Sequence, residues 1–274
     1  MQGMTAAALL LATLAAPPPF GKLVTLGGHR VHLYCEGQGP ATVLLLHGTP
    51  RFSFHFALVW PKVAEFARVC VYDRAGDAWS EPASGQPTAA IFVDELDRVV
   101  NHLSPRRPVV LAGHSIGGVL ARAYYARHPA RVSAMVLIDT LPLTATSKPP
   151  AVWPKATLDP PFDQLPARFQ AAHLWATDKW YEYAAAVESA QAEQYQADLF
   201  DWAGRARRAR LPVWFLSRSG SEAWVEKQRQ MAAQWTRSTF VQVEHSGHDI
   251  ELDQPDAVVA AIRAAVASAA AHAK

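Results

Sequence analysis

The chain has 274 residues, half of them apolar and 18% charged, which fits a folded globular protein and excludes an intrinsically disordered one. Its 26 basic and 24 acidic residues leave a formal net charge of +2, so no strong field favours nucleic acid or an anionic membrane surface. Two cysteines are too few for a disulfide scaffold, and no apolar run reaches the ~18 residues of a transmembrane helix.

Residues 1–20 differ in character from the rest of the chain. Thr5 to Ala16 is an apolar stretch with the length of a signal-peptide core, and Thr13-Leu14-Ala15 fits a small-x-small cleavage site. However, no Lys or Arg precedes the stretch, whereas a signal peptide usually has a positively charged segment before its apolar core. Two hypotheses stay open: an export signal, slightly favoured, for a periplasmic or secreted protein, or an N-terminal extension of a cytoplasmic one.

Between residues 21 and 140, strand-like runs alternate with helical runs. A glycine pair between Leu23–Leu26 and Arg30–Cys35 predicts two strands joined by a tight turn. Short apolar runs with β-branched members predict strands buried on both faces. These strands are expected at Thr42–Leu46, Val69–Tyr72, Val109–Ala112 and Ala134–Ile138, with helices at Trp60–Phe66, Ala90–Leu103 and Val119–Arg127. The alternation favours a mainly parallel sheet with helices on both faces.

The alternation stops between residues 141 and 208, where proline-rich chain leads into tryptophan-containing helical segments. We expect these residues to form a helical cap, inserted after the sixth strand over the carboxyl edge of the sheet. Residues 21–140 and 209–274 then form the core. Its last elements are expected to be strands at Val213–Leu216 and Thr239–Val243 and helices at Glu222–Trp235 and from Pro255 onward.

A serine stands in a glycine-rich turn between a predicted strand and a predicted helix. Gly113-His114-Ser115-Ile116-Gly117 is a G-x-S-x-G sequence in the strand–turn–helix context of a nucleophile elbow. A sharp turn requires the positions two residues before and after the serine to lack side chains. We expect Ser115 to be a nucleophile at the N-terminus of a helix, where negative charge is favoured. The alternative is a structural turn with an inert serine.

A serine nucleophile needs a base, and two histidines follow the last predicted strand. His248 is the expected base, because a loop there can carry its imidazole across the sheet edge to Ser115. His245 lies closer to the strand and is expected to be structural. Together with Asp249 the pair could suggest a metal site, but no second ligand cluster with zinc-like spacing accompanies it, so we expect none.

Two carboxylates are candidates for the acid that orients the base. Asp139 ends the sixth predicted strand, at the edge where catalytic groups gather, and gives the order serine–acid–histidine. Glu222 follows the next strand, but it also begins a predicted helix, where a carboxylate has a sufficient role opposite the helix dipole. The sequence favours Asp139 and keeps Glu222 as the alternative.

The loop after the third predicted strand, His47-Gly48-Thr49-Pro50, is the expected source of oxyanion donors. The backbone N–H groups of Thr49 and Ile116 can point at one oxygen. His47 is expected to order this loop rather than to transfer protons.

Together these motifs resemble the α/β-hydrolase superfamily, specifically the group with esterases, epoxide hydrolases and haloalkane dehalogenases. The resemblance spans roughly residues 23–265 except the insertion, and its stretches are His47–Pro50, Tyr72–Ser80, the elbow, Val136–Asp139 and Ser246–Asp249. It implies an α/β-hydrolase fold with an eight-stranded, mostly parallel sheet, in which the second strand is antiparallel and lies beside the fourth. That placement brings Cys35 near Cys70, so a disulfide is one hypothesis if the protein is exported, and two buried thiols are the other.

The chain also departs from related sequences. It has Asp77 and Ala78 where an aromatic residue and glycine are usual, and it lacks the usual aspartate after the seventh strand. Dehalogenase-like members place their acid after the sixth strand, as Asp139 is here, but their nucleophile is aspartate. Ser115 therefore disfavours dehalogenase and epoxide hydrolase activity.

We predict a serine hydrolase that cleaves a carboxylic ester or related acyl compound through an acyl-enzyme intermediate, without a cofactor. The same triad could instead serve an acyltransferase, an aminopeptidase or a cofactor-free haloperoxidase, and a binding module with an inactive triad is the non-enzymatic alternative. The expected partner is a small, apolar acyl substrate, with a pocket lined by His114, Trp175, Trp180 and Tyr181. Aromatic residues at helical spacing also pack as core, which is the alternative for these.

Overall fold

The computed structural model describes residues 16–84, 88–143, 155–186, 189–206 and 211–272. They form an eight-stranded sheet with the strand order β1-β2-β4-β3-β5-β6-β7-β8. The pairs β1–β2 and β2–β4 are antiparallel and all other pairs are parallel, as the resemblance implied. The strands are β1 (Lys22–Leu26), β2 (His29–Glu36), β3 (Thr42–Leu46), β4 (Arg68–Tyr72), β5 (Val109–His114), β6 (Val132–Ile138), β7 (Val213–Arg218) and β8 (Ser238–Val243).

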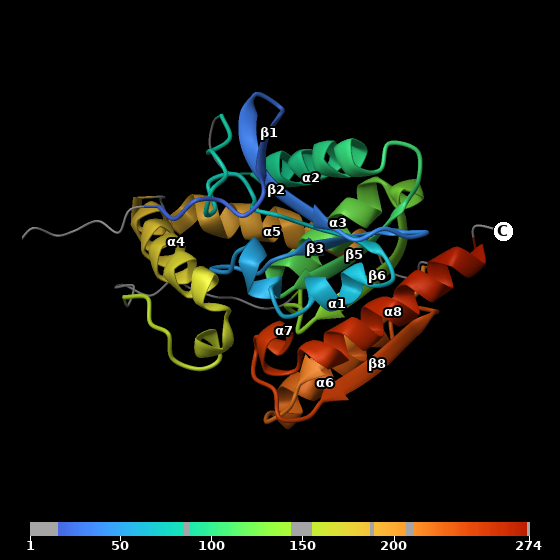
Figure 1. The fold of residues 1–274 in the computed structure, drawn as a ribbon. Coiled ribbons are helices and arrows are strands. Elements are labelled where there is room, and N and C mark those ends of the chain that lie inside the picture. The colour runs from blue at the N-terminus through green and yellow to red at the C-terminus, as the bar shows by residue number, and fades with distance from the viewer. Residues whose placement is uncertain (1–15, 85–87, 144–154, 187–188, 207–210, 273–274) are drawn as a thin grey trace, which may run out of the picture.

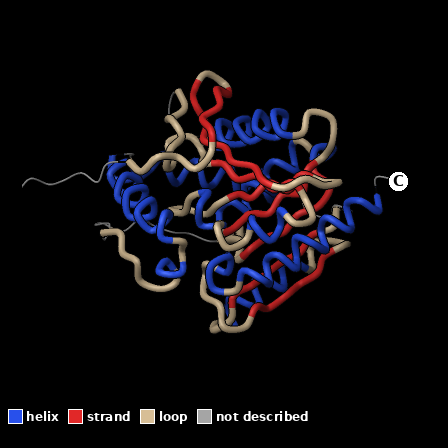
Figure 2. The backbone as a smooth tube through the Cα atoms, viewed as in Figure 1, coloured by secondary structure: helices blue, strands red, loops and turns tan. Residues whose placement is uncertain are grey.

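Helices cover both faces of the sheet (Figures 1 and 2). One face carries α1 (Trp60–Ala64) and α8 (Pro255–His272), and the other carries α2 (Ala89–Leu103), α3 (Ile116–Arg127) and α6 (Glu222–Ala232). The shorter elements are the 3₁₀ turns η1 (Ser53–Phe56), η2 (Pro129–Arg131) and η3 (Phe162–Gln164), and the helix α7 (Ile250–Asp253).

The central strand β3 divides the interior into two cores. Val43 and Leu45 pack on the side of α1 and α8, whereas Leu44 and Leu46 pack on the side of α2 and α3. All four are at most 1% exposed. Successive side chains of a strand point to opposite faces, so a strand covered on both faces is apolar throughout. Burial of each such side chain contributes ~1.5–3 kcal/mol, which makes β3 and its neighbours a rigid base for the loops at their ends.

The chain between β6 and β7 forms η3, α4 (Ala167–Ala186) and α5 (Ser189–Arg205). Phe169 and Ala172 of α4 join the core on the α1 and α8 side, and Leu199 and Ala203 of α5 join the other core. The described part of this insertion is helical, as its sequence predicts, and it contributes side chains to both cores. Its function as a cap stays a prediction.

Residues 16–20 dock onto the body of the protein. The indole N–H of Trp79 donates a hydrogen bond to the Pro17 carbonyl oxygen at 2.7 Å. The Phe20 ring lies 4.7–5.6 Å, centroid to centroid, from the rings of His32, Tyr34, Trp60, Trp79 and Phe169. Most of the predicted signal-peptide core, Thr5–Ala16, and its cleavage site at Thr13–Ala15 lie outside the described residues, which begin at Ala16.

Strands β2 and β4 are linked by a disulfide between Cys35 and Cys70, which are direct neighbours in the antiparallel register. Of the two hypotheses for these cysteines, the structure has the disulfide.

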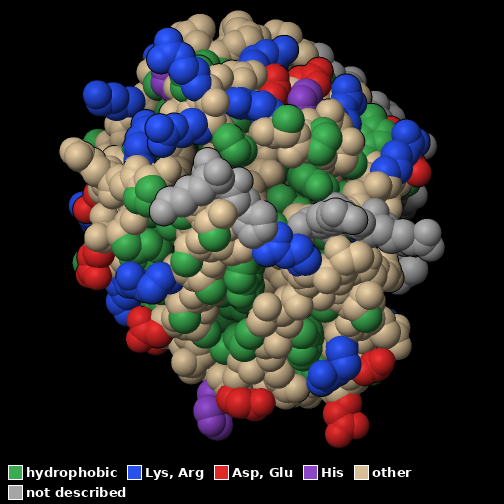
Figure 3. Space-filling model, turned by 90° about the vertical axis from the view of Figure 1, so that its right-hand side faces the viewer, with side chains coloured by type: hydrophobic (Ala, Val, Ile, Leu, Met, Phe, Trp, Pro, Cys, Tyr) green, Lys and Arg blue, Asp and Glu red, His purple; other side chains and the backbone are tan. Residues whose placement is uncertain are grey.

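The surface carries both signs of charge. Acidic and basic side chains both occur around the face drawn in Figure 3, with hydrophobic side chains among them, mainly toward its middle. Among the described residues, no helix combines the length and the apolar character that a bilayer crossing requires.

Candidate functional site

Ser115 is the single residue between β5 and α3, in a conformation that side chains rarely adopt. Its φ is 53° and its ψ is −121°. The sequence predicts a helix start at Val119, but α3 begins at Ile116, so the turn is tighter than expected. A Cβ atom on Gly113 would lie 2.5 Å from the carbonyl carbon of Gly117, and one on Gly117 would collide with the Leu46 carbonyl oxygen. Both elbow positions therefore require glycine.

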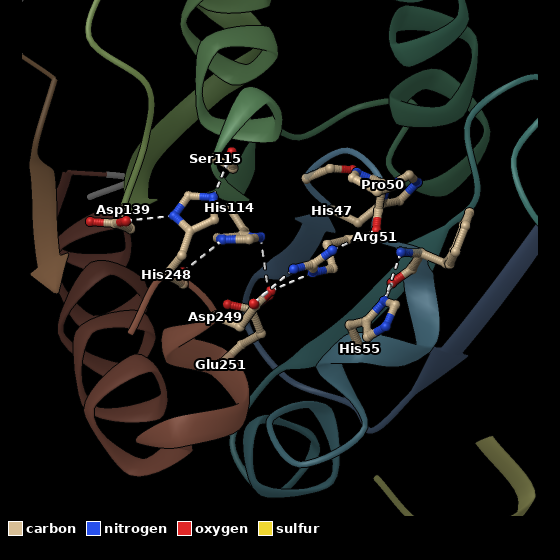
Figure 4. Close-up of polar contacts among 12 residues, drawn as sticks. His47, Pro50, Arg51, His55, His114, Ser115, Asp139, His248, Asp249 and Glu251 are labelled. Atoms are coloured by element: carbon tan, nitrogen blue, oxygen red, sulfur yellow. Dashed lines mark hydrogen bonds and ion pairs between the residues drawn. The ribbon is translucent and has the colours of Figure 1, made fainter. Parts of the chain in front are cut away.

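The structure brings three of the predicted catalytic side chains together (Figure 4). The Nε2 atom of His248 lies 3.0 Å from the Ser115 Oγ atom, and its Nδ1 atom lies 2.5 Å from Oδ2 of Asp139. The alternative acid, Glu222, is exposed in the first turn of α6, directly after the N-cap residue Ser221. That position gives Glu222 a role opposite the helix dipole.

Asp139 is fully buried and receives four hydrogen bonds. Its Oδ1 atom accepts from the main-chain N–H of Arg218 at 3.1 Å and from the indole N–H of Trp224 at 2.6 Å. Its Oδ2 atom accepts from Arg218 Nη1 at 2.9 Å and from His248. A buried carboxylate requires such compensation, and four donors also fix its orientation.

Arg218 and Trp224 are the neighbours of Asp139 that sequence reasoning missed. The Arg218 guanidinium also stacks on the Trp224 ring, with 4.1 Å from Cζ to the ring centroid. No local signal could have found Arg218, because only the pairing of β6 with β7 brings this last residue of β7 to Asp139.

The loop after β3 lies against the nucleophile. A Cβ atom on Gly48 would be 3.1 Å from Cβ of Ser115. Arg74 also holds this loop: its Nη1 donates to the His47 carbonyl oxygen at 2.5 Å, and its Nη2 donates to the Gly48 carbonyl oxygen at 2.8 Å. Because the C=O and N–H of one trans peptide unit point in opposite directions, the Thr49 N–H points away from Arg74. Its role as an oxyanion donor with the Ile116 N–H stays a prediction.

Two buried titratable groups support the same loop. Burial, followed by the charge of Arg74, lowers the pKa of His47 well below its ordinary value, and its Nδ1 atom is 2.8 Å from the Gly48 carbonyl oxygen. A neutral His47 fits the predicted loop-ordering role. Asp77 lies 3.3 Å from Arg74, and burial raises the pKa of the Asp77 carboxyl to about 7.

A second polar cluster lies beside the catalytic side chains (Figure 4). Arg51 donates to both carboxylate oxygens of Asp249, at 2.5 and 2.9 Å. His114, predicted to line the pocket, is fully buried; its Nε2 atom is 2.9 Å from the His248 carbonyl oxygen, and its Nδ1 atom is 3.1 Å from Glu251 Oε1. The cluster was not expected from the sequence.

Some of these atoms could bind a metal. Across the part of the chain that the structure describes, one group of three ligand side chains is close enough: His114, Asp249 and Glu251, whose ligand atoms lie within 4.8 Å of one another. His245, the first histidine of the H-x-x-H sequence, lies elsewhere, in an exposed turn with φ 56°.

The predicted aromatic pocket residues lie on α4. Trp175 packs on Trp79 with 5.5 Å between ring centroids, and Trp180 and Tyr181 are 5.9 Å apart. Trp175 and Trp180 also pack against the core on the α1 and α8 side. These contacts show a packing role, and the pocket role stays a prediction.

Residues 43–261, well over half of the chain, match the model of the alpha/beta hydrolase family. The chain belongs to the alpha/beta hydrolase family. This α/β-hydrolase is 32% identical over 127 residues to 2-hydroxymuconate semialdehyde hydrolase of Pseudomonas sp. (strain CF600), covering 45% of this chain and 44% of the relative. It is 29% identical over 126 residues to cis-3-alkyl-4-alkyloxetan-2-one decarboxylase of Shewanella oneidensis, covering 44% and 39%. The matches thus span less than half of these relatives' lengths.

The same α/β-hydrolase architecture occurs in a thermophilic esterase from Thermogutta terrifontis. The TM-score is 0.64 at 20% identity, over 91% of this chain and 99% of the esterase chain. At that identity the likeness shows the fold alone.

Proposed function

We propose that this α/β-hydrolase is a serine hydrolase that cleaves a carboxylic ester or a related acyl substrate through an acyl-enzyme intermediate. The observation that carries the proposal is the chain of contacts from Ser115 Oγ to His248 Nε2 at 3.0 Å and from His248 Nδ1 to Asp139 at 2.5 Å. A serine hydroxyl becomes an effective nucleophile when a base accepts its proton and a third group holds that base.

In the first half of the reaction, Ser115 Oγ attacks the substrate carbonyl carbon while His248 Nε2 accepts the hydroxyl proton. Asp139 accepts the Nδ1–H hydrogen bond, which selects the tautomer with a free Nε2 lone pair and stabilises the imidazolium that forms. The N–H groups of Thr49 and Ile116 donate to the oxyanion of the tetrahedral intermediate. That intermediate collapses when His248 protonates the leaving alkoxide.

In the second half, His248 takes a proton from water, and the resulting hydroxide attacks the acyl carbon. The second tetrahedral intermediate then collapses as His248 returns this proton to Ser115 Oγ, which releases the acid and restores both the Ser115 hydroxyl and the neutral imidazole. No step requires a metal or an organic cofactor.

The substrate is expected to present an apolar acyl group to the insertion. Trp175, Trp180 and Tyr181 on α4 are the aromatic side chains that we assign to this pocket. An acyltransferase, an aminopeptidase or a cofactor-free haloperoxidase would use the same three catalytic side chains and differ in the pocket.

Fluorophosphonate labelling tests the proposal without knowledge of the substrate. The folded protein should be labelled on Ser115, and Ser115→Ala should remove both labelling and hydrolysis, the latter by at least about 10³-fold. A panel of p-nitrophenyl esters of graded chain length, with an amide, a lactone and 2-hydroxymuconate semialdehyde, then identifies the substrate class. A folded protein that is neither labelled nor active on the panel would instead support a binding module.

A further inference from the structure

Glu251 is a buried acid that the proposed reaction does not use. Its side chain is 1% exposed, and neither carboxyl oxygen forms a hydrogen bond of good geometry. Its Oε1 atom faces the Nδ1 atom of His114 at 3.1 Å, and that nitrogen also has no hydrogen-bond partner of good geometry. Two unpartnered polar atoms at this distance require a proton between them, because two bare acceptors would repel.

The other nitrogen of His114 shows where that proton belongs. Nε2 lies 2.9 Å from the main-chain carbonyl oxygen of His248. A carbonyl oxygen only accepts, so Nε2 carries the hydrogen. In the neutral ring Nδ1 is then an acceptor, and the hydrogen in the contact with Glu251 sits on the carboxyl group.

The charges around the pair favour this neutral arrangement. Burial, reinforced by the negative charge of Asp249, raises the pKa of Glu251 well above its ordinary value. Burial, followed by the proximity of His248, lowers the pKa of His114 to about 3. Arg51 is already matched by Asp249 through two hydrogen bonds.

We propose that His114 is a positioning residue for the general base, acting through the main-chain oxygen of His248, and that Glu251 fixes the tautomer of His114. This inference rests on the proposed function, because the residue it positions is the proposed base. His114 ends β5 and directly precedes Ser115, so the strand that carries the nucleophile also holds the loop that carries the base. The His114 and His248 rings also lie 4.6 Å apart, centroid to centroid.

The same cluster is a poor metal site. Both oxygens of Asp249 accept hydrogen bonds from Arg51, so a cation bound to His114, Asp249 and Glu251 would have to displace a guanidinium. We therefore do not propose a metal site here, and metal binding is one of the results that the experiment below can detect.

Two pairs of variants test the positioning role. His114→Leu removes the hydrogen bond to His248, whereas His114→Gln keeps an N–H near the position of Nε2. Glu251→Leu removes the donor to Nδ1, whereas the amide of Glu251→Gln can replace a protonated carboxyl group. The readouts are the rate of fluorophosphonate labelling and, on an ester that the wild type cleaves, kcat and KM separately.

His114→Leu is expected to lower the labelling rate and kcat by about 10–100-fold with KM within about twofold, because a displacement of ~1 Å can cost about 100-fold. Glu251→Leu is expected to lower the labelling rate and kcat by about tenfold. Both glutamine variants are expected to stay within about threefold of the wild type.

The proposal is overturned if folded His114→Leu reacts like the wild type, or if His114→Gln is no better than His114→Leu. If His114→Leu does not fold, as judged by circular dichroism, the Glu251 pair decides, and equal rates for Glu251→Leu and Glu251→Gln overturn it. A zinc-dependent loss of labelling that Glu251→Leu abolishes would also overturn it, in favour of a metal site.

Histidine ¹⁵N NMR of the full chain separates this inference from the proposed function. The signal that disappears in His114→Gln should report a neutral Nε2–H tautomer throughout the range from about pH 5 to 8. An imidazolium or an Nδ1–H tautomer would overturn the inference. Absence of labelling in the wild type, with the expected tautomer present, would contradict the proposed function instead.

Discussion

Replacement of Asp139 by Asn exchanges one oxygen for an NH₂ group in the most tightly held part of the proposed site. Four donors surround the carboxylate: the Arg218 and Trp224 N–H groups at Oδ1, and Arg218 Nη1 and His248 Nδ1 at Oδ2. An amide has one oxygen, so two of these donors lose their acceptor whichever way it turns.

The structure predicts which way the amide turns. If the NH₂ group takes the Oδ1 position, it faces the main-chain N–H of Arg218 and the indole N–H of Trp224. Both of these donors then lack an acceptor, which costs ~1–3 kcal/mol for each. With NH₂ at the Oδ2 position, His248 can accept from it by changing tautomer, and the Arg218 side chain, 28% exposed, can turn toward water. The second orientation is cheaper, so the free energy of unfolding should fall by only about 1–3 kcal/mol.

That orientation blocks the proposed chemistry. The imidazole proton moves to Nε2, which can then no longer accept the proton of Ser115. The wrong tautomer costs about 10⁴-fold in kcat in a serine protease with such a triad, or ~5 kcal/mol of transition-state stabilisation.

The assay compares kcat/KM for an ester substrate and urea unfolding for Asp139→Asn, the wild type and Glu222→Gln. The exposed Glu222 is the matched control, and its variant should stay within about twofold. The reasoning is refuted if Asp139→Asn keeps a tenth or more of the activity, or if Glu222→Gln loses more than about tenfold.

Three further predictions concern stability. Burial raises the pKa of Asp77 to about 7, so the contribution of this carboxyl to stability falls as pH rises from about 4 to 7. Above pH 7, Asp77→Asn should therefore be more stable than the wild type by roughly 1–4 kcal/mol. Urea unfolding of both proteins at pH 5 and pH 8 measures this difference. Burial lowers the pKa of His173 to about 4, so its neutral form stabilises the fold above about pH 6.5 and that stability is lost toward pH 4; His173→Gln should reduce this loss by about 1 kcal/mol per pH unit. Reduction of the disulfide between Cys35 and Cys70, 35 positions apart, should lower the free energy of unfolding by about 4 kcal/mol on a chain-entropy estimate, and unreduced denatured protein should contain no free thiol.

Each of these has a contrary result. A stability difference between Asp77→Asn and the wild type that does not change with pH would contradict the first prediction. The second prediction fails if His173→Gln has the same acid sensitivity as the wild type. The glutamine keeps an N–H for the Thr157 carbonyl oxygen, which His173 contacts at 3.0 Å. Titration of two thiols in denatured, unreduced protein would exclude the disulfide.

Features with a local signal were predictable from the sequence. The apolar run Thr42–Leu46 is a strand with those bounds, and the glycines around Ser115 form the turn that their spacing predicts. The approach of Ser115, Asp139 and His248 was also expected, because parallel strands bring their carboxyl ends to one edge of a sheet.

Contacts decided by tertiary packing were not predictable. Arg218 reads as an ordinary basic residue after a strand, and only the pairing of β6 with β7, Ile138 opposite Leu216, brings it to Asp139. Arg51 reaches Asp249 from 198 positions away. Glu251 lies between two apolar residues in the one-turn helix α7, and only the packing of that turn shows it to be buried rather than a surface acid.

The docking of Phe20 has a practical consequence for anyone preparing this protein. Its ring fills the junction of β2, α1, α4 and the loop that carries Trp79, so a recombinant chain that started at Lys22 would leave a hollow lined by five other rings. Purification tags therefore belong at the far end, after α8. A fusion partner at the N-terminus needs a spacer long enough for residues 16–20 to keep their contacts with the folded protein.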